Sequence, residues 1–590
     1  MPNPYDPKNL ARLRRAIDSS RYRLEPFRRR HKEAMEQYVG VYYSDNGAER
    51  PVHMNLMEIA TNIYERQLIA RPPKVNILTR QKRLKPTSAK LESVMNALLE
   101  TTTLHRELAR AVKSALYSIG IIKVGRKYSG TFEYEGEEFA RTVPIAQHVL
   151  LDDWVHDMSA LNIEECSFMG HRYRMPLSVA KENEDFDKVE RERLQKMETG
   201  QFNPGGDERI STISQQNSIL EDEYDPKVEL WEIWIPRSKL LVTLSPIEDA
   251  KPLRVVEWDG PEHGPFHMLF FNEVDGNSMP LAPAMLWQGL HRIVNSMYRK
   301  LERQAARQKT VGLARGVDTE DAERVRRASD GEVVPINGGL PIEEVSMGGI
   351  DQNTFAFMLQ SKEMFSWLSG NLDALGGLGP QSETVGQDRL MFASANQRVS
   401  GMQDAVQIFV KQVLTDWGFY LWQDPIEAYP ATLKLDGLED LPSELTAQER
   451  NDAAYYDMML EIEPYSMQFK SPGERLATLN QIVSGVVLPS LPLMQQQGMG
   501  LDMSALLSLY SDYADMPELQ DIVTYQGHPS GEEGSPPSEG PGKPSVTHRT
   551  NERVSRPGAT RQGAEQVMVN QMLGGNSQQS EKEGAMRQMS

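Results

Sequence analysis

The sequence lacks the usual features of a secreted or membrane protein. Among its 590 residues there is one cysteine, Cys166, which excludes an intrachain disulfide and any multi-cysteine zinc or iron–sulfur site. No apolar run approaches the roughly 20 residues that a membrane helix needs. The amino-terminal charges have no apolar run behind them, which argues against a secretory signal. We expect a soluble protein of a reducing compartment, without membrane contact and without a cofactor.

Positive charge is scarce as well. The chain has 64 Lys and Arg against 83 Asp and Glu, a net charge of −19. A simple DNA-binding protein is usually basic, because its affinity comes from neutralising phosphates. This chain is expected to repel DNA over most of its surface.

Signatures of common enzymes are missing too. The chain has no G-x-x-x-x-G-K-[ST] phosphate loop, no G-x-S-x-G nucleophile elbow and no H-E-x-x-H zinc motif. We therefore expect no enzyme and no metal site. The best metal candidates are His148, Asp152, Asp153, His156 and Asp157, which we interpret as turn and cap groups. A metal-dependent nucleic-acid-processing enzyme remains the alternative. Cys166 with His171 is interpreted as a half-buried strand cysteine rather than a thiolate–imidazole pair.

The first half of the chain predicts an α+β region. Amphipathic patterns predict helices at 54–70, 87–101, 104–118 and 176–197, the first ending at Pro72-Pro73. Apolar runs predict strands at 121–124, 228–236, 239–244 and 266–271.

The second half predicts long helices. Residues 283–308 place one apolar stripe on a helix: Leu286, Leu290, Ile293, Val294, Met297 and Leu301. A small α/β insert at 310–350 precedes a second helix from Asp351 or Asn353. A Gly-rich loop at 376–386 precedes a helix at 386–422. Further expectations are strands at 431–438 and 459–467, a capping box at Thr446 and Glu449, helices over 473–525, and disorder from 526.

The two helices on either side of the insert predict an antiparallel hairpin with that insert at its tip. One monomer gives such a hairpin little to pack against. Several copies around an axis would bury the apolar stripes, which favours a ring.

In this order of parts the chain resembles the portal proteins of tailed bacteriophages over about residues 8–525. The similar passages are ERPVHMNLMEIATNIYERQLIARPPKV, AVKSALYSIGIIKVG, EWDGPEHGPFHMLFFNEVDGNSMPLAP, GEVVPINGG and SETVGQDRLMFASANQRVSGMQDAVQIFV. The similarity lies in the order of these passages and in their local sequence patterns, not in a catalytic signature.

The resemblance implies a mainly helical α+β portal fold that assembles as a ring of twelve. The implied parts are a wing at 1–282, stem helices at 283–309 and 351–372, a clip at 310–350, a tunnel loop, long helix and returning wing strands at 373–470, a helical crown at 471–525 and a disordered tail at 526–590. The ring would stand at the portal vertex of the capsid, after assembly in the host cytoplasm. Implied partners are double-stranded DNA passing without sequence reading, the terminase large subunit, head–tail adaptor and tail proteins, and the major capsid and scaffold proteins. A capsid or scaffold component without a channel is a further alternative.

Two sets of residues are candidates for contact with DNA. Basic side chains of the first stem helix would touch backbone phosphates or, equally well, form salt bridges between subunits: Arg292, Arg299, Lys300, Arg303 and Arg307. The tunnel loop would move against DNA or merely connect two helices, and its candidate residues are Gly376, Gly377, Gly379, Glu383 and Asp388.

Overall fold

The computed structural model describes most of the chain up to residue 463. The described residues are 6–40, 54–134, 137–195, 226–247, 250–313, 343–347, 349–376, 385–424, 428–433, 441–463, 466–467 and 479–487, with a few single positions beyond and between them. The chain divides into two compact units, Met1–Ile482 and Val483–Ser590. Helices and strands mix in the first unit, so the expected α+β class is correct.

A long amino-terminal helix, α1 (Pro7–Val39), covers the sheets. Asp6 caps it by accepting a hydrogen bond from the Lys8 backbone N–H, and Pro7 stands at the first helical position, where no N–H is needed. Leu10 and Ile17 are buried against the strands. Since these two residues are seven apart, one face of the helix supplies the contact.

Three helices follow, as the sequence predicts: α2 (Leu56–Ile69), α3 (Lys85–Thr101) and α4 (Leu104–Tyr117). The end of α2 at Ile69 agrees with the stop predicted at Pro72-Pro73. Asn55 caps α2 through the Glu58 backbone N–H.

The first unit has two larger antiparallel sheets, of which the first packs against α4. The first has the order β3-β2-β9, with β2 at Gly120–Tyr134, β3 at Glu137–His148 and β9 at Phe266–Leu269. The second has the order β4-β5-β6-β7-β8, with strands at Trp154–His156, Met169–Pro176, Lys227–Ile235, Leu240–Leu244 and Arg254–Glu257. The sequence analysis did not predict β3, β4, β5 and β8, which are short or poorly alternating.

The single helix predicted at 176–197 is wrong. The structure has two short helices there, α5 (Leu177–Glu182) and α6 (Lys188–Glu192). Asp187 accepts hydrogen bonds from the backbone N–H groups of Val189 and Glu190 and so begins a new helix. Phe186 is buried immediately before it, which fixes the break between the two helices.

The long helices of the second half form as predicted. They are α8 (Pro283–Ala306), α10 (Gln352–Leu368) and α12 (Val385–Trp422), with a short α11 (Leu372–Leu375) before α12. Strand β12 (Tyr429–Leu433) pairs with β13 (Leu441–Leu445), and β14 (Met458–Ile462) pairs with β1 (Val75–Thr79). The predicted capping box of Thr446 and Glu449 begins α13 (Ala447–Asn451).

Only small parts of the last predicted regions are described. In the helical cluster expected at 473–525, residues 479–482 are helical and Val483–Val487 form a π-helical turn. The residues expected to be disordered, 526–590, lie outside the described part of the chain.

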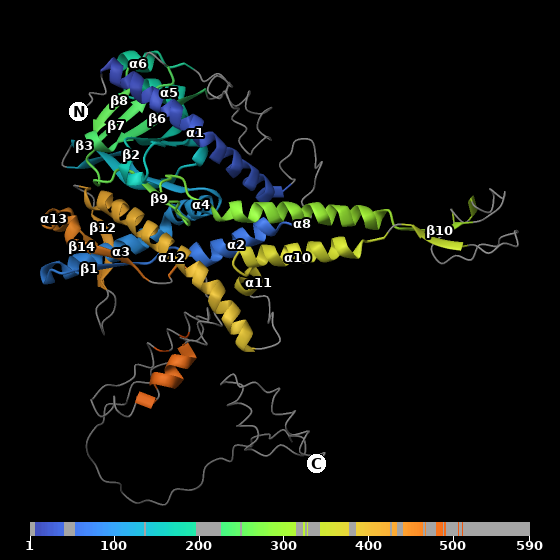
Figure 1. Cartoon of the computed structure of the whole chain (residues 1–590). Coiled ribbons are helices and arrows are strands. Elements are labelled where there is room, and N and C mark those ends of the chain that lie inside the picture. The colour runs from blue at the N-terminus through green and yellow to red at the C-terminus, as the bar shows by residue number, and fades with distance from the viewer. Residues whose placement is uncertain are drawn as a thin grey trace, which may run out of the picture. The chain divides into compact units, whose positions relative to one another are not determined.

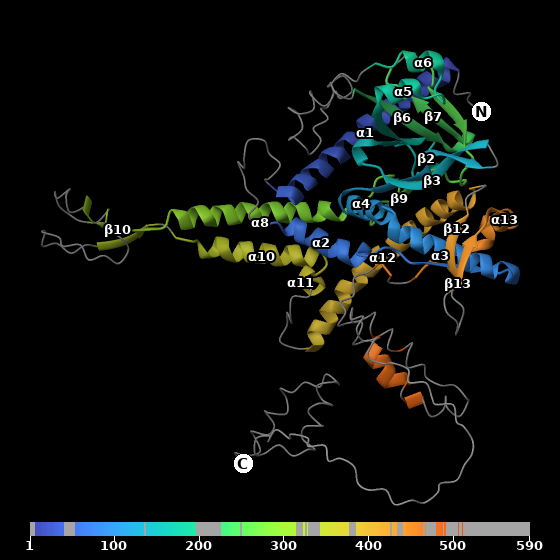
Figure 2. The same ribbon diagram turned by 180° about the vertical axis from the view of Figure 1, so that it is seen from behind.

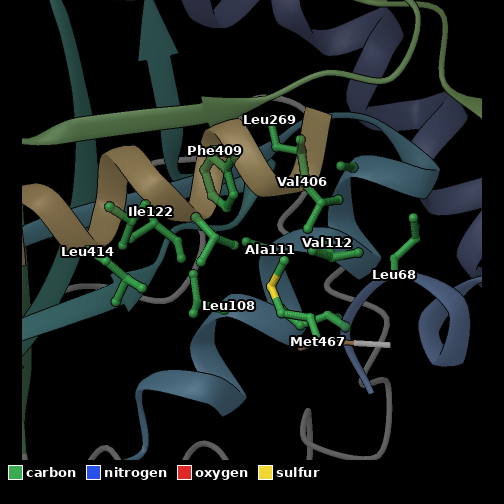
Figure 3. Packing of buried hydrophobic residues seen from close by; sticks show 14 of the residues in the cluster. Leu68, Leu108, Ala111, Val112, Ile122, Leu269, Val406, Phe409, Leu414 and Met467 are labelled. Carbon is green, nitrogen blue, oxygen red and sulfur yellow. The ribbon is translucent and has the colours of Figure 1, made fainter. Parts of the chain in front are cut away.

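The main core joins segments that are far apart in the sequence. Figure 3 shows Val406 and Phe409 of α12 facing Ala111 and Val112 of α4, with Ile122 of β2 beside them. All five are buried. Replacing a buried Phe such as Phe409 by Ala typically costs about 3–5 kcal/mol, because the cavity is not refilled. This core fixes α12 and the root of α8 to the same body.

Candidate nucleic-acid interface

Helix α8 is anchored at its amino-terminal half. Pro283 begins the helix, and Ala284, Trp287 and Val294 are buried in the main core. The Trp287 ring stacks on Tyr64 of α2, with 5.4 Å between ring centroids. After Val294 and Asn295 the next buried residue of α8 is Leu301, so the second half of the helix leaves the body.

Polar contacts also hold the amino-terminal half of α8 against the body of the protein. Asn295 is buried and makes two hydrogen bonds to the Met54 backbone, of 3.0 and 2.9 Å. His291 donates from Nε2 to the same Met54 carbonyl at 3.2 Å. Burial lowers the pKa of His291 to about 4, so the ring is neutral near pH 7. Together they hold the chain before α2 against α8.

The second helix returns antiparallel along the first. Asp351 caps α10 through the backbone N–H groups of Asn353 and Thr354, as one of the two predicted starts requires. Three contacts define the register: Gln304 with the Asp351 backbone, Lys300 with Thr354, and the ring of His291 near Phe365. The sum of the paired numbers is nearly constant, as an antiparallel pair demands. Figures 1 and 2 show α8 and α10 side by side.

A two-stranded sheet lies at the end of the hairpin. Strand β10 (Lys309–Leu313) pairs antiparallel with β11 (Glu343–Met347), from Lys309 opposite Met347 to Leu313 opposite Glu343. Figure 1 shows β10 beyond the last turn of α8. Most of the predicted α/β insert between these two strands lies outside the described residues.

The line along which α8 and α10 pack against each other is called the seam here. The hairpin exposes apolar side chains on both sides of this seam. Within α10 the seam residues Thr354, Met358, Ser361 and Phe365 are buried. Phe355 and Phe357 remain 46% and 51% exposed. Two positions along an α-helix turn a side chain by about 160°, so these rings lie on opposite flanks of the seam. Leu359 follows Phe355 and Met364 follows Phe357 on the same two flanks, and both are exposed.

The apolar stripe predicted on α8 is only partly covered within one chain. Val294 and Leu301 are buried, and Leu290 and Met297 pack half-buried against the core. Leu286 and Ile293 are exposed. The face that is fully buried instead carries Trp287, His291 and Asn295, which the stripe did not contain. The uncovered residues thus form a further apolar flank on the hairpin.

Basic side chains occupy another face of α8. Arg292, Arg299 and Arg303 are spaced by seven and four residues, which places them along one side of the helix. Between 283 and 307 the sequence has five basic residues and one acid, Glu302, in a chain with a net charge of −19. Arg292 lies 3.7 Å from Glu33. This segment is a positive strip on an acidic chain.

The basic residues in the second half of α8 differ in their contacts. Lys300 donates to Thr354 across the seam at 3.3 Å, which fixes its position on the hairpin. Arg299 is half-buried, whereas Arg303 and Arg307 are exposed near the tip. The exposed guanidinium groups are able to reach a phosphate while the helix keeps its internal contacts.

The predicted tunnel loop is described only at its edges. Gly376 ends α11 with an N–H bonded to the Leu372 carbonyl at 2.7 Å, and a Cβ there would come within 3.2 Å of Ile63. Asp388 lies in α12, but its side chain is outside the described part. Gly377, Gly379 and Glu383 also lie outside the described residues.

Different partners contact four of the five metal candidates of the sequence analysis, namely His148, Asp153, His156 and Asp157. His148 contacts the Ser114 hydroxyl at 2.9 Å, and Asp153 pairs with Arg172 at 2.8 Å. Asp157 accepts hydrogen bonds from the Ser159 and Ser167 backbone N–H groups. Within the described ranges, the one group of three or more His, Cys, Asp or Glu with metal-ligand spacing lies elsewhere and contains none of these five.

The Cys166 and His171 pair is not built for thiolate chemistry. Burial raises the pKa of Cys166 to about 12 and lowers the pKa of His171 to about 3, so both are neutral near pH 7. Cys166 is buried between a short 3₁₀ turn and β5, not half-buried in a strand as expected. A nucleophile at this position is unsupported.

Comparison with known proteins adds no relative. No protein-family model matches the sequence, and a search of curated proteins finds no significant match. Among the described helices, none combines the length and the apolar character needed to cross a bilayer.

Proposed function

We propose that copies of this chain form a phage portal ring, a DNA channel whose stem is the α8–α10 hairpin. The observation that carries the proposal is the hairpin itself: two antiparallel helices, rooted in the core at one end and bearing a small sheet at the other, with apolar side chains on both flanks.

The two flanks favour a ring over a symmetric dimer. Phe355 and Phe357 lie on opposite sides of the seam, and each flank has its own set of neighbours. A contact between two different surfaces is heterologous, and it repeats until the rotation closes a ring. Exposed apolar area of this kind is otherwise an aggregation hazard for a monomer.

The charge distribution suits a channel through which DNA slides. Twelve copies at −19 each give roughly −230, a field that weakens tight phosphate binding. The strip containing Arg299, Arg303 and Arg307 would make a few backbone contacts without reading sequence. Salt bridges between neighbouring subunits remain the competing role for the same residues.

The remaining parts of the proposal follow the family resemblance. The tip of the hairpin, 310–350, would dock the terminase large subunit and later the head–tail adaptor and tail proteins. The residues up to 282 would contact the major capsid and scaffold proteins at the portal vertex of the virion, after assembly in the host cytoplasm. The loop around Gly376 would face the passing duplex.

The direct test is the mass and shape of the purified protein. A ring of twelve 66.7 kDa chains has a mass of about 800 kDa, and negative-stain images should show closed rings with a central hole wide enough for a duplex. A monomer that cleaves DNA with a divalent metal would favour the enzyme alternative. Filaments or shells without closed rings would favour a scaffold component, and either result would refute the portal.

A further inference from the structure

Three side chains from distant segments meet beside α12. His263 lies in the loop before β9, His267 lies in β9, and Asp416 lies in α12. The Oδ2 atom of Asp416 is 2.7 Å from Nε2 of His263 and 2.8 Å from Nε2 of His267. The three donor atoms lie within 4.8 Å of one another. The strand and the helix are therefore joined through one carboxylate.

The loop is shaped to bring His263 to this point. Gly264 has a φ of 92°, and a Cβ there would lie 2.3 Å from Nε1 of Trp234, so only glycine fits. The Gly264 N–H bonds to the Pro261 carbonyl at 3.1 Å, and the Trp258 indole donates to the same carbonyl at 2.6 Å. Two residues after this turn begins β9, whose face toward α12 carries His267.

Asp416 is a carboxylate with little water around it. The residue is 3% exposed, and within the described segments its ion-pair partners are the two imidazoles. Burying a carboxylate is costly unless a positive charge or several hydrogen bonds compensate it. The two imidazoles supply hydrogen bonds to it. A bound cation would supply the charge.

We propose that His263, His267 and Asp416 bind a divalent transition-metal ion of the zinc type. Two imidazole nitrogens with one carboxylate oxygen suit Zn²⁺ and similar ions better than Mg²⁺ or Ca²⁺, which prefer oxygen. Ligand atoms at 2.0–2.1 Å around a tetrahedral ion are about 3.3 Å apart, so each carboxylate–imidazole separation must grow by only about 0.5 Å. The inference stands apart from the proposed portal function.

The surroundings define an open side for the ion. His267 is buried, while the side chain of His263 is 55% exposed, so a fourth ligand such as water reaches the ion from solvent. The ion would replace the two hydrogen bonds by stronger links between the His263 loop, β9 and α12. It would thereby fasten the long helix to the three-stranded sheet.

The test is metal binding by the full chain, purified without a polyhistidine tag and stripped with a chelator. Calorimetry with Zn²⁺ alone should show one saturable site per chain, and Co²⁺ should give visible absorption typical of tetrahedral sites. His263→Ala removes an exposed ligand and should weaken Zn²⁺ binding at least about tenfold, since even loss of a group that only orients a ligand costs 10–100-fold. Asp416→Asn should do the same, and added Zn²⁺ should raise the Tm of the wild type but not of these two variants.

The control is His105→Gln, a half-buried histidine of α4 outside the cluster, which should bind Zn²⁺ like the wild type. Absence of a stoichiometric Zn²⁺ site would overturn the proposal. So would a folded His263→Ala protein, judged by circular dichroism, that binds Zn²⁺ and Co²⁺ as the wild type does. Stronger binding of Mg²⁺ than of Zn²⁺ would also contradict it.

Discussion

Asn295 pairs with the backbone of Met54 as a neighbouring strand would. Its Oδ1 accepts from the Met54 N–H at 3.0 Å, and its Nδ2 donates to the Met54 carbonyl at 2.9 Å. The two residues are 241 positions apart. Asn295 is also the last buried residue of α8 before the helix leaves the core, so this pairing marks the root of the hairpin.

Replacing Asn295 by Ala should lower the free energy of unfolding by about 2 kcal/mol, because the Met54 N–H is left without its acceptor in a partly buried place. Urea denaturation followed by circular dichroism measures the change. Ser296→Ala, on the exposed face of the same helix, is the control and should stay within about 0.5 kcal/mol. Equal stability of the two variants would show that Asn295 does not anchor the helix.

Phe355→Glu and Phe357→Glu should each abolish ring formation, because a charge on either flank opposes burial of that flank. Mixing the two variants should restore a pair, since each keeps the flank that is altered in the other. Native mass spectrometry would detect this dimer near twice 66.7 kDa. Gln360→Glu, exposed on the same helix, is the control and should still form rings.

If both phenylalanine variants still formed rings, the two flanks would not be the interface between subunits. Homodimers of only one variant, with no pairing between the two, would instead point to a symmetric contact in which both copies use one flank.

Changing Arg292, Arg299 and Arg303 together to Gln should weaken binding of linear duplex DNA by intact rings and lower packaged DNA. The slope of log K against log salt should fall by about 1 for each phosphate that the ring no longer neutralises. The control changes Lys181, Lys188 and Arg237 to Gln, which removes the same charge from exposed sites outside α8. Unchanged DNA binding and packaging with intact rings would end the phosphate hypothesis. Dissociated rings would identify subunit salt bridges.

The buried, neutral state of His156 predicts that the protein loses stability in mild acid. The Trp154 indole donates to its Nδ1 at 3.1 Å, so the ring is neutral with its proton on Nε2, which faces the Ser278 hydroxyl at 2.9 Å. Burial lowers the pKa of His156 to about 4. Between that value and the unfolded pKa of about 6.5 the unfolded chain binds more protons, so stability falls as the pH falls.

We expect His156 to contribute a loss of about 2 kcal/mol between pH 7 and pH 5, an order-of-magnitude value from the shift. His156→Gln keeps a neutral polar side chain, and its unfolding free energy should change correspondingly less over this range. Urea midpoints at pH 7, 6 and 5 measure the difference. The same pH dependence in both proteins would mean that His156 is protonated in the folded state.

Local features of the fold were predictable because they depend on residues close in sequence. The ends of α2 and α10 follow from Pro72-Pro73 and from Asp351, and the start of α13 follows from Thr446 with Glu449. The prediction of a single helix at 176–197 was wrong for a local reason as well. The Asp187 side chain caps a new helix there, and this competes with continuation of the first helix.

The candidate site was predicted in part. The hairpin and its basic residues were expected from periodicity, but the buried face of α8 was not, because polar His291 and Asn295 replace apolar residues there. Their partner, Met54, has no local signal. The His-x₃-His spacing of His263 and His267 is visible in the sequence, but nothing local connects it to Asp416, which is 149 positions from His267.

Residue order alone was enough to predict most of the long helices, an acidic chain with a positive helix at 283–307, and the return of 283–368 around a small insert. These properties follow from spacings of two to four residues and from charge. Three-dimensional packing was needed to select the buried face of α8, the exposed flanks of the hairpin and the meeting of two histidines with one aspartate. Such pairings join segments hundreds of residues apart, and many registers satisfy the same local pattern until the core selects one.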